Sequence, residues 1–134
     1  LMGRAAFVAG VKHQDPAVRV LTGFCGTQDD NAVTRDWAAA QIAEGADILF
    51  TMLNGARQGA VDACRAAGPR VRQIGNALDW TARDPAVFVA SAIARIDLGV
   101  LGAITDMTAG RTPPDSVEFG LAGGQEGGDR VDAR

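Results

Sequence analysis

The residues best suited to chemistry in this chain are polar side chains that follow short apolar runs. Asn54 and Gly55 follow the apolar run 48–52, and Asp79 comes shortly after the run 71–75. Two such runs separated by a helical pattern predict a βαβ unit of a parallel sheet. Ligands of these sheets bind outside the carboxyl ends of the strands, so polar groups at that edge could hold a small polar ligand.

No catalytic or metal-binding pattern accompanies these residues. The sequence contains no nucleophile elbow, no phosphate-binding glycine loop and no cluster of metal ligands, so we expect no catalytic residue, no metal and no cofactor. The two cysteines, Cys25 and Cys64, are too few for a disulfide scaffold. They are either buried free thiols or one disulfide, which would need Cα atoms within about 7 Å of each other.

The composition is that of a globular domain. With 134 residues and a net charge of −3, the chain is one domain or part of one. Acidic and basic residues are interspersed without a basic stripe, so we expect no nucleic-acid partner. Neither a signal peptide nor an apolar run of membrane-spanning length is present, and the first residues are typical of a helix already under way. We interpret the chain as a mature protein or a fragment.

Hydrophobic periodicity and turn residues predict strands that alternate with helices along most of the chain. We expect helices near residues 2–13, 32–44, 56–67 and 92–109, and strands near 18–25, 48–52, 71–75, 87–90 and 117–120. This order predicts an α/β fold, a three-layer and mostly parallel sheet flanked by helices, with its opening strand missing. Residues 1–122 would form one ligand-binding lobe and residues 123–134 a flexible tail.

Six segments, taken in order, resemble the motifs of one family. The clearest is Glu44-Gly45-Ala46-Asp47-Ile48-Leu49-Phe50, which is similar to Q-G-A-D-V-I-F, and Ile74-Gly75 before Asp79 resembles I-G-V-D-x-D. The other four segments are residues 7–16, 26–30, 91–97 and 119–121. These motifs are those of the basic membrane protein (BMP) family, which are solute-binding lipoproteins of ABC importers with a type I periplasmic-binding-protein fold. The chain resembles the C-terminal half of these proteins, many of which bind purine nucleosides.

This resemblance implies a role in transport and not in catalysis. The chain would be one lobe of the solute-binding component of an ABC importer, with a hinge-crossing segment near residues 76–91. Closure of this lobe and a missing N-terminal lobe would capture a small polar ligand, nucleoside or nucleobase-like, for an ABC permease. The protein would be periplasmic or a membrane-anchored lipoprotein whose signal is not in this chain.

The strand-end positions and the resemblance together indicate seven candidate ligand contacts: Gln28, Asp29, Asn54, Gly55, Asp79, Trp80 and Ser91. Simpler structural roles compete with several of them. Asn54-Gly55 is also a typical turn before a helix, and Asp30, next to Asp29, is a candidate helix N-cap. Ser91 is likewise a candidate N-cap for the helix that follows it.

The chain departs from the family pattern at three ligand-contacting positions. Gln28 stands where the family often has an aromatic ring that stacks on the base of a nucleoside. Ala77 and Ala94 replace the Asp and the Lys that hold the ribose in nucleoside-binding members. Trp80 is a candidate for the missing stacking surface, and the resemblance therefore indicates binding more firmly than any one ligand.

Two other functional classes share this fold. An α/β enzyme domain would use Cys25 or Asp79 at the strand edge, but the only histidine, His13, is predicted at the opposite edge of the sheet. An effector-binding domain of a transcription regulator would need no catalytic residues, and a DNA-binding module upstream would reveal it.

Overall fold

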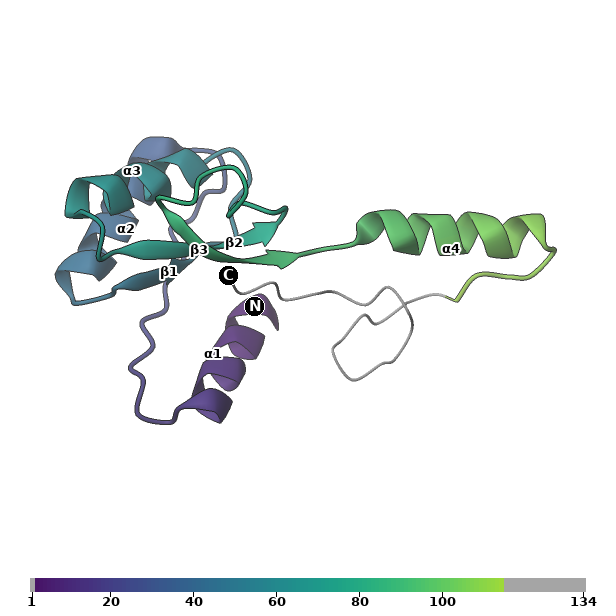
Figure 1. Cartoon of the computed structure of the whole chain (residues 1–134), viewed down its shortest axis with the longest axis horizontal. Coiled ribbons are helices and arrows are strands. Elements are labelled where there is room, and N and C mark those ends of the chain that lie inside the picture. The colour runs from purple at the N-terminus through teal and green to yellow at the C-terminus, as the bar shows by residue number, and fades with distance from the viewer. Residues whose placement is uncertain (1, 115–134) are drawn as a thin grey trace. The chain divides into compact units, whose positions relative to one another are not determined.

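The computed structural model describes residues 2–114 of the chain (Figure 1). They form two compact units, one that ends at Gln73 and one that begins at Ile74. The first unit contains α1 (Met2–Gln14), α2 (Asn31–Ala43), β1 (Ile48–Phe50) and α3 (Arg57–Ala67). Strand β2 (Arg72–Ala77) begins at the end of the first unit, and β3 (Phe88–Ile93) and α4 (Ile96–Thr108) belong to the second.

The three strands form one parallel sheet in the order β1-β2-β3. The starts of β1 and β2 lie side by side, because the backbone N–H of Arg72 donates to the carbonyl of Asp47 at 2.9 Å. The ends of β2 and β3 also lie side by side, because the N–H of Ala94 donates to the carbonyl of Ala77 at 3.2 Å. Pairing of start with start and end with end defines parallel strands. The predicted α/β class with a parallel sheet is confirmed.

The strand predicted at residues 18–25 is wrong. The segment has no regular secondary structure, although its apolar residues are those of a strand. A strand exists only as part of a ladder, and this segment pairs with none of the three strands of the sheet, β1, β2 and β3. An open groove of about 610 Å³ lies instead between α1 and this segment, lined on one side by Val20 and Thr22. Phe24 is accordingly 57% exposed.

The junction between the last strand and the last helix also differs from the prediction. Strand β3 continues to Ile93, and α4 begins at Ile96, because the backbone of residue 94 still pairs with β2. Ser91 therefore lies inside a strand and is not the N-cap of the helix. The strand predicted at residues 117–120 and the tail predicted at 123–134 lie outside the described residues.

Small residues allow α2 and α3 to pack closely in the first unit. A Cβ atom added to Gly59 would lie 2.1 Å from the carbonyl oxygen of Asn31 and 2.4 Å from the hydroxyl of Thr34, so this position accepts only glycine. Thr34 is buried and donates its hydroxyl hydrogen to the carbonyl of Ala56 at 2.7 Å. The core around this contact consists of Ala38, Leu49, Ala56, Ala60, Val61, Ala63 and Cys64.

Helix α4 buries none of its residues. Five of its large apolar side chains are more than half exposed, namely Ile96, Val100, Leu101, Ile104 and Met107, while Leu98 is half-buried. The sequence predicted this helix and its apolar face, but nothing in the described part of the chain covers that face. Within residues 2–114 no helix combines the length and the apolar character needed to cross a membrane.

Candidate functional site

Two loops of the first unit meet at the start of α3, and we call them the loop pair (residues 27–30 and 53–56). The carboxylate of Asp29 accepts a hydrogen bond from the backbone N–H of Gly55 at 3.0 Å. The carbonyl of Gln28 accepts one from the N–H of Ala56 at 2.9 Å. The structure therefore brings together Gln28, Asp29, Asn54 and Gly55, four of the seven residues predicted from the sequence.

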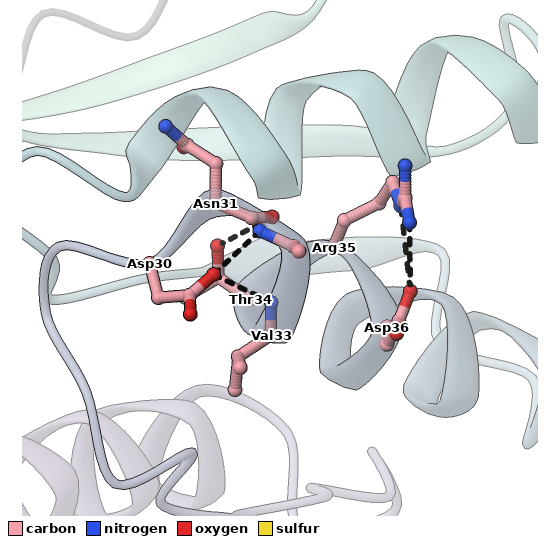
Figure 2. A network of polar contacts seen from close by, with 7 residues as sticks. Asp30, Asn31, Val33, Thr34, Arg35 and Asp36 are labelled. Atoms are coloured by element: carbon pink, nitrogen blue, oxygen red, sulfur yellow. Dashed lines mark hydrogen bonds and ion pairs between the residues drawn. The ribbon is translucent and has the colours of Figure 1, made fainter.

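The first of these loops is held at both ends by side-chain caps. The hydroxyl of Thr27 accepts hydrogen bonds from the N–H groups of Asp29 and Asp30, both at 3.2 Å. Figure 2 shows that the carboxylate of Asp30 caps α2, where it accepts from Ala32 and Val33 at 2.9 and 3.2 Å. The predicted N-cap role of Asp30 is confirmed. These bonds leave the loop backbone little freedom to move.

The helix that follows the second loop is tied to the first loop as well. Asn31, drawn in Figure 2, accepts a hydrogen bond from the N–H of Gly59 through its side-chain oxygen at 2.8 Å. The guanidinium of Arg57 donates to the carbonyl of Leu53 at 3.1 Å. Partial burial lowers the pKa of Arg57, but an arginine keeps its proton at any physiological pH, so a positive charge lies under the second loop.

Two polar side chains of the loop pair are not used in the hydrogen bonds described above. The amides of Gln28 and Asn54 are exposed, and among residues 2–114 neither has a hydrogen-bond partner. Each amide offers a donor and an acceptor in one plane. The loop pair thus presents two amides to solvent on a backbone that is fixed by hydrogen bonds.

The other three predicted residues form a second cluster, in the second unit. The hydroxyl of Ser91 accepts hydrogen bonds from the N–H groups of Trp80 and Thr81 at 2.9 and 3.2 Å, and Ser91 is only 3% exposed. Asp79 is exposed and accepts from the N–H of Ala82 at 3.1 Å. Ser91 therefore holds the loop that carries Asp79 and Trp80.

The ring of Trp80 packs on residues of its own unit. It lies 5.5 Å from the ring of Phe88, centroid to centroid, and 5.3 Å from the guanidinium carbon of Arg83. A Cβ atom on Gly75 would lie 2.6 Å from the Trp80 side chain, so this glycine gives the ring its room. The indole N–H donates to the carbonyl of Asn76 at 3.0 Å. Tertiary packing, which sequence reasoning could not foresee, places this tryptophan.

Catalytic and metal-binding arrangements are not found in the part of the chain that the structure describes. No group of three His, Cys, Asp or Glu residues within residues 2–114 could hold a metal ion. Both cysteines are free thiols, Cys25 half-buried and Cys64 buried. Burial raises the pKa of the Cys64 thiol, which makes it a poor nucleophile near neutral pH.

The parallel sheet flanked by helices places this chain in the α/β class, and its fold is similar to that of a solved solute-binding protein. A solved structure of an ABC transporter system solute-binding protein from Aeropyrum pernix K1 matches 91% of the chain with a TM-score of 0.68 and 24% sequence identity. At this identity the likeness concerns the fold. The chain spans about a third of that structure's length, 34%. No protein with curated annotation matches the chain significantly.

A match to a family model identifies the family of this chain. The model of the Bmp family, described as PnrA-like ABC transporter substrate-binding proteins, matches residues 2–124. This chain belongs to the Bmp family. The resemblance read from the six sequence segments is thereby confirmed.

Proposed function

We propose that this chain is a lobe of the solute-binding component of an ABC importer and captures a small polar ligand, nucleoside or nucleobase-like. The observation that carries the proposal is the loop pair, which presents unpaired amides on a fixed backbone in a chain of the Bmp family. Binding sites of this kind use a few well-placed polar groups for orientation. The role is binding and not catalysis.

Capture follows from closure of two lobes over the ligand. Residues 1–122 supply one lobe, the segment near residues 76–91 crosses the hinge, and the other lobe belongs to the rest of the protein. Ligand contacts stabilise the closed state, and an ABC permease recognises that state. The protein acts outside the cytoplasm, in the periplasm or anchored to the membrane as a lipoprotein.

The candidate residues divide into contacts and supports. From the loop pair, Gln28, Asn54 and the backbone of Gly55 contact the ligand, while Asp29 holds Gly55 in place through its 3.0 Å hydrogen bond. For the second cluster, we assign ligand contacts to Asp79 and Trp80. Ser91 supports them through its hydrogen bonds to the loop.

A thermal-shift screen of the protein with ribonucleosides, free nucleobases and pentoses tests the proposal. A ligand that binds only the folded state, at 100 times its Kd, stabilises the protein by about 2.7 kcal/mol. We expect such a shift with at least one nucleoside or nucleobase, and a smaller shift in Asn54→Ala. Gln14→Ala, which removes an exposed amide at the end of α1, is the matched control and should leave the shift unchanged. A screen in which no compound stabilises the protein contradicts the proposal.

A further inference from the structure

We propose that the groove between α1 and residues 19–24 binds an extended peptide of a partner protein, which pairs with residues 19–24 as a β-strand. We call residues 19–24 the unpaired segment. The peptide that fits is apolar and carries two carboxylates on the face that it turns toward α1. The groove contains no residue of the loop pair or of the cluster around Ser91, so this interaction is separate from the capture of a solute.

Every second side chain of the unpaired segment lies toward α1. Val20 and Thr22 line the open groove of about 610 Å³ beside that helix. The ring centroid of Phe24 lies 5.3 Å from the guanidinium carbon of Arg4, which is also a residue of α1. The even-numbered residues 20, 22 and 24 therefore share one face of the segment.

The side chains between them lie toward α2. Arg19 donates a hydrogen bond to the carbonyl of Glu44, the C-cap residue of α2. A Cβ atom on Gly23 would lie 2.5 Å from the ring of Trp37 in the same helix. Contacts that alternate between two helices are those of a strand in the middle layer of an α/β fold.

The backbone of this segment lacks the partners that a strand needs. Within residues 2–114, no backbone N–H or carbonyl group of residues 19–24 takes part in a hydrogen bond. Helix α1 covers the sheet as well as the segment, because the ring of Phe7 stacks on that of Phe50 in β1 at 4.9 Å. An apolar extended segment with unpaired backbone groups is a template for a further strand. Peptides bind such templates through main-chain hydrogen bonds.

The charge of the groove selects the peptide. Arg4 and Lys12 are the charged residues that line it, and neither forms an ion pair within residues 2–114. The ammonium of Lys12 donates only to the carbonyls of Pro16 and Val18, at 2.9 and 2.6 Å. Two cations without a countercharge favour a peptide with carboxylates. They disfavour a second copy of this chain, which would bring two more cations to the interface.

The spacing of the two cations sets the spacing of the carboxylates. Helix α1 runs antiparallel to the segment, because Arg4 lies over Phe24 and Lys12 bonds to Val18. Eight positions along a helix correspond to roughly 12 Å. A strand rises about 3.3 Å per residue, so side chains at positions i and i+4 share one face and lie roughly 13 Å apart. An apolar side chain at i+2 then faces the helix near Val8.

The test is to measure Kd values of capped synthetic peptides for the full 134-residue chain by fluorescence anisotropy. The probe is a peptide of valine and threonine with glutamates at positions i and i+4. We expect it to bind more tightly than the same peptide with two lysines, and than one with glutamates at i and i+3, which lie on opposite faces. Methylation of its backbone nitrogens removes the donors of the ladder and should weaken binding roughly tenfold or more.

Variants of the protein test the other side of the contact. Arg4→Gln should weaken the glutamate peptide roughly 2- to 5-fold, the range for an exposed ion pair. Arg70→Gln removes an exposed arginine outside the groove, so it is the matched control and should not change the affinity. In amide exchange followed by NMR, the glutamate peptide should slow every second backbone amide of residues 19–24, because a strand pairs along one edge.

Slowed exchange at residues 19–24 together with preference for the glutamate peptide supports the proposal. It is overturned if the glutamate peptide does not bind, or if the methylated or lysine peptide binds as tightly. An unchanged affinity in Arg4→Gln overturns it as well, because the cations would then play no part in recognition. If the chain associates with itself without peptide and protects residues 19–24, a second copy occupies the groove and the proposal is wrong.

Discussion

Gln73 is the residue whose replacement should most clearly stabilise this protein. It lies in β2, is 0% exposed, and its side-chain oxygen Oε1 has no hydrogen-bond partner among the described residues. Its Nε2 donates to the sulfur of Cys64 at 3.5 Å, which is a weak acceptor at a long distance. A buried polar atom without a partner costs about 1–3 kcal/mol of folding free energy.

Gln73→Met replaces the amide with an apolar side chain of similar length. The variant removes the unpaired oxygen and loses only the weak bond to Cys64, so we expect a net gain of about 1 kcal/mol in the free energy of unfolding. For a chain of this length that gain corresponds to a rise in Tm of roughly 3–5 °C. Urea unfolding followed by circular dichroism, with calorimetry for Tm, measures both quantities.

Two control variants make the result specific to the buried amide. Gln14→Met makes the same chemical change at an exposed position and should alter the stability by less than about 0.5 kcal/mol. Gln73→Glu keeps the shape but adds an ionisable group to a dry site, and should destabilise strongly. If Gln73→Met lowers the stability by about 1 kcal/mol or more, Oε1 has a partner such as a buried water, and the reasoning is refuted.

Four further predictions concern helix packing, a buried hydrogen-bond acceptor, a left-handed backbone position and the titration of a thiol. Gly59→Ala should lower the free energy of unfolding by about 1–3 kcal/mol in urea unfolding, because its methyl group overlaps the backbone of α2. The control Gly10→Ala, whose Cβ atom would have nothing within 4 Å, should raise the free energy of unfolding by up to about 1 kcal/mol. Ser91→Ala leaves two loop N–H groups without an acceptor and should cost about 1–3 kcal/mol, with faster amide exchange of both. Ala77→Gly should stabilise by roughly 0.5–1 kcal/mol, because this alanine has a left-handed φ of 67°. Burial raises the pKa of the Cys64 thiol above its ordinary value of 9.0, because the folded state favours the neutral thiol. The contribution of this preference to the free energy of unfolding is complete below pH 9.0 and falls as the pH rises further. Urea unfolding from about pH 7 to about pH 10 measures that fall.

Each of these predictions has a result that contradicts it. A Gly59→Ala variant as stable as the parent would mean that the two helices can move apart at no cost. Unchanged amide exchange in Ser91→Ala would mean that its hydroxyl does not hold the loop. A destabilised Ala77→Gly variant would mean that chain entropy outweighs the left-handed backbone. Alkaline destabilisation of the same size in Cys64→Ala would assign that effect to another group.

Local patterns in the sequence were sufficient for most of the described helices and strands. The N-cap of α2 at Asp30 and the turn at Asn54-Gly55 depend on interactions within a few residues, and the apolar runs of the strands on either side of α3 are visible in the sequence. The order of six short motifs was sufficient for the family. Asn54 was predicted from its position after the strand that became β1, whereas Gln28 was predicted at the end of a segment that is not a strand.

The tertiary structure decided what depends on contacts between distant residues. The apolar segment 18–25 is not a strand, because a strand needs a neighbouring ladder and its own residues cannot supply one. Ser91, a candidate ligand contact or helix N-cap, is a buried acceptor inside β3, and Trp80, a candidate ligand contact, packs on Phe88 within its own unit. Asp29, one of the candidate ligand contacts, accepts a hydrogen bond from Gly55, 26 residues away. Hydrophobic periodicity and helix caps depend on residues that are close in the sequence. Strand partners and buried hydrogen-bond acceptors depend on residues far apart in the sequence, which come together only in the folded protein.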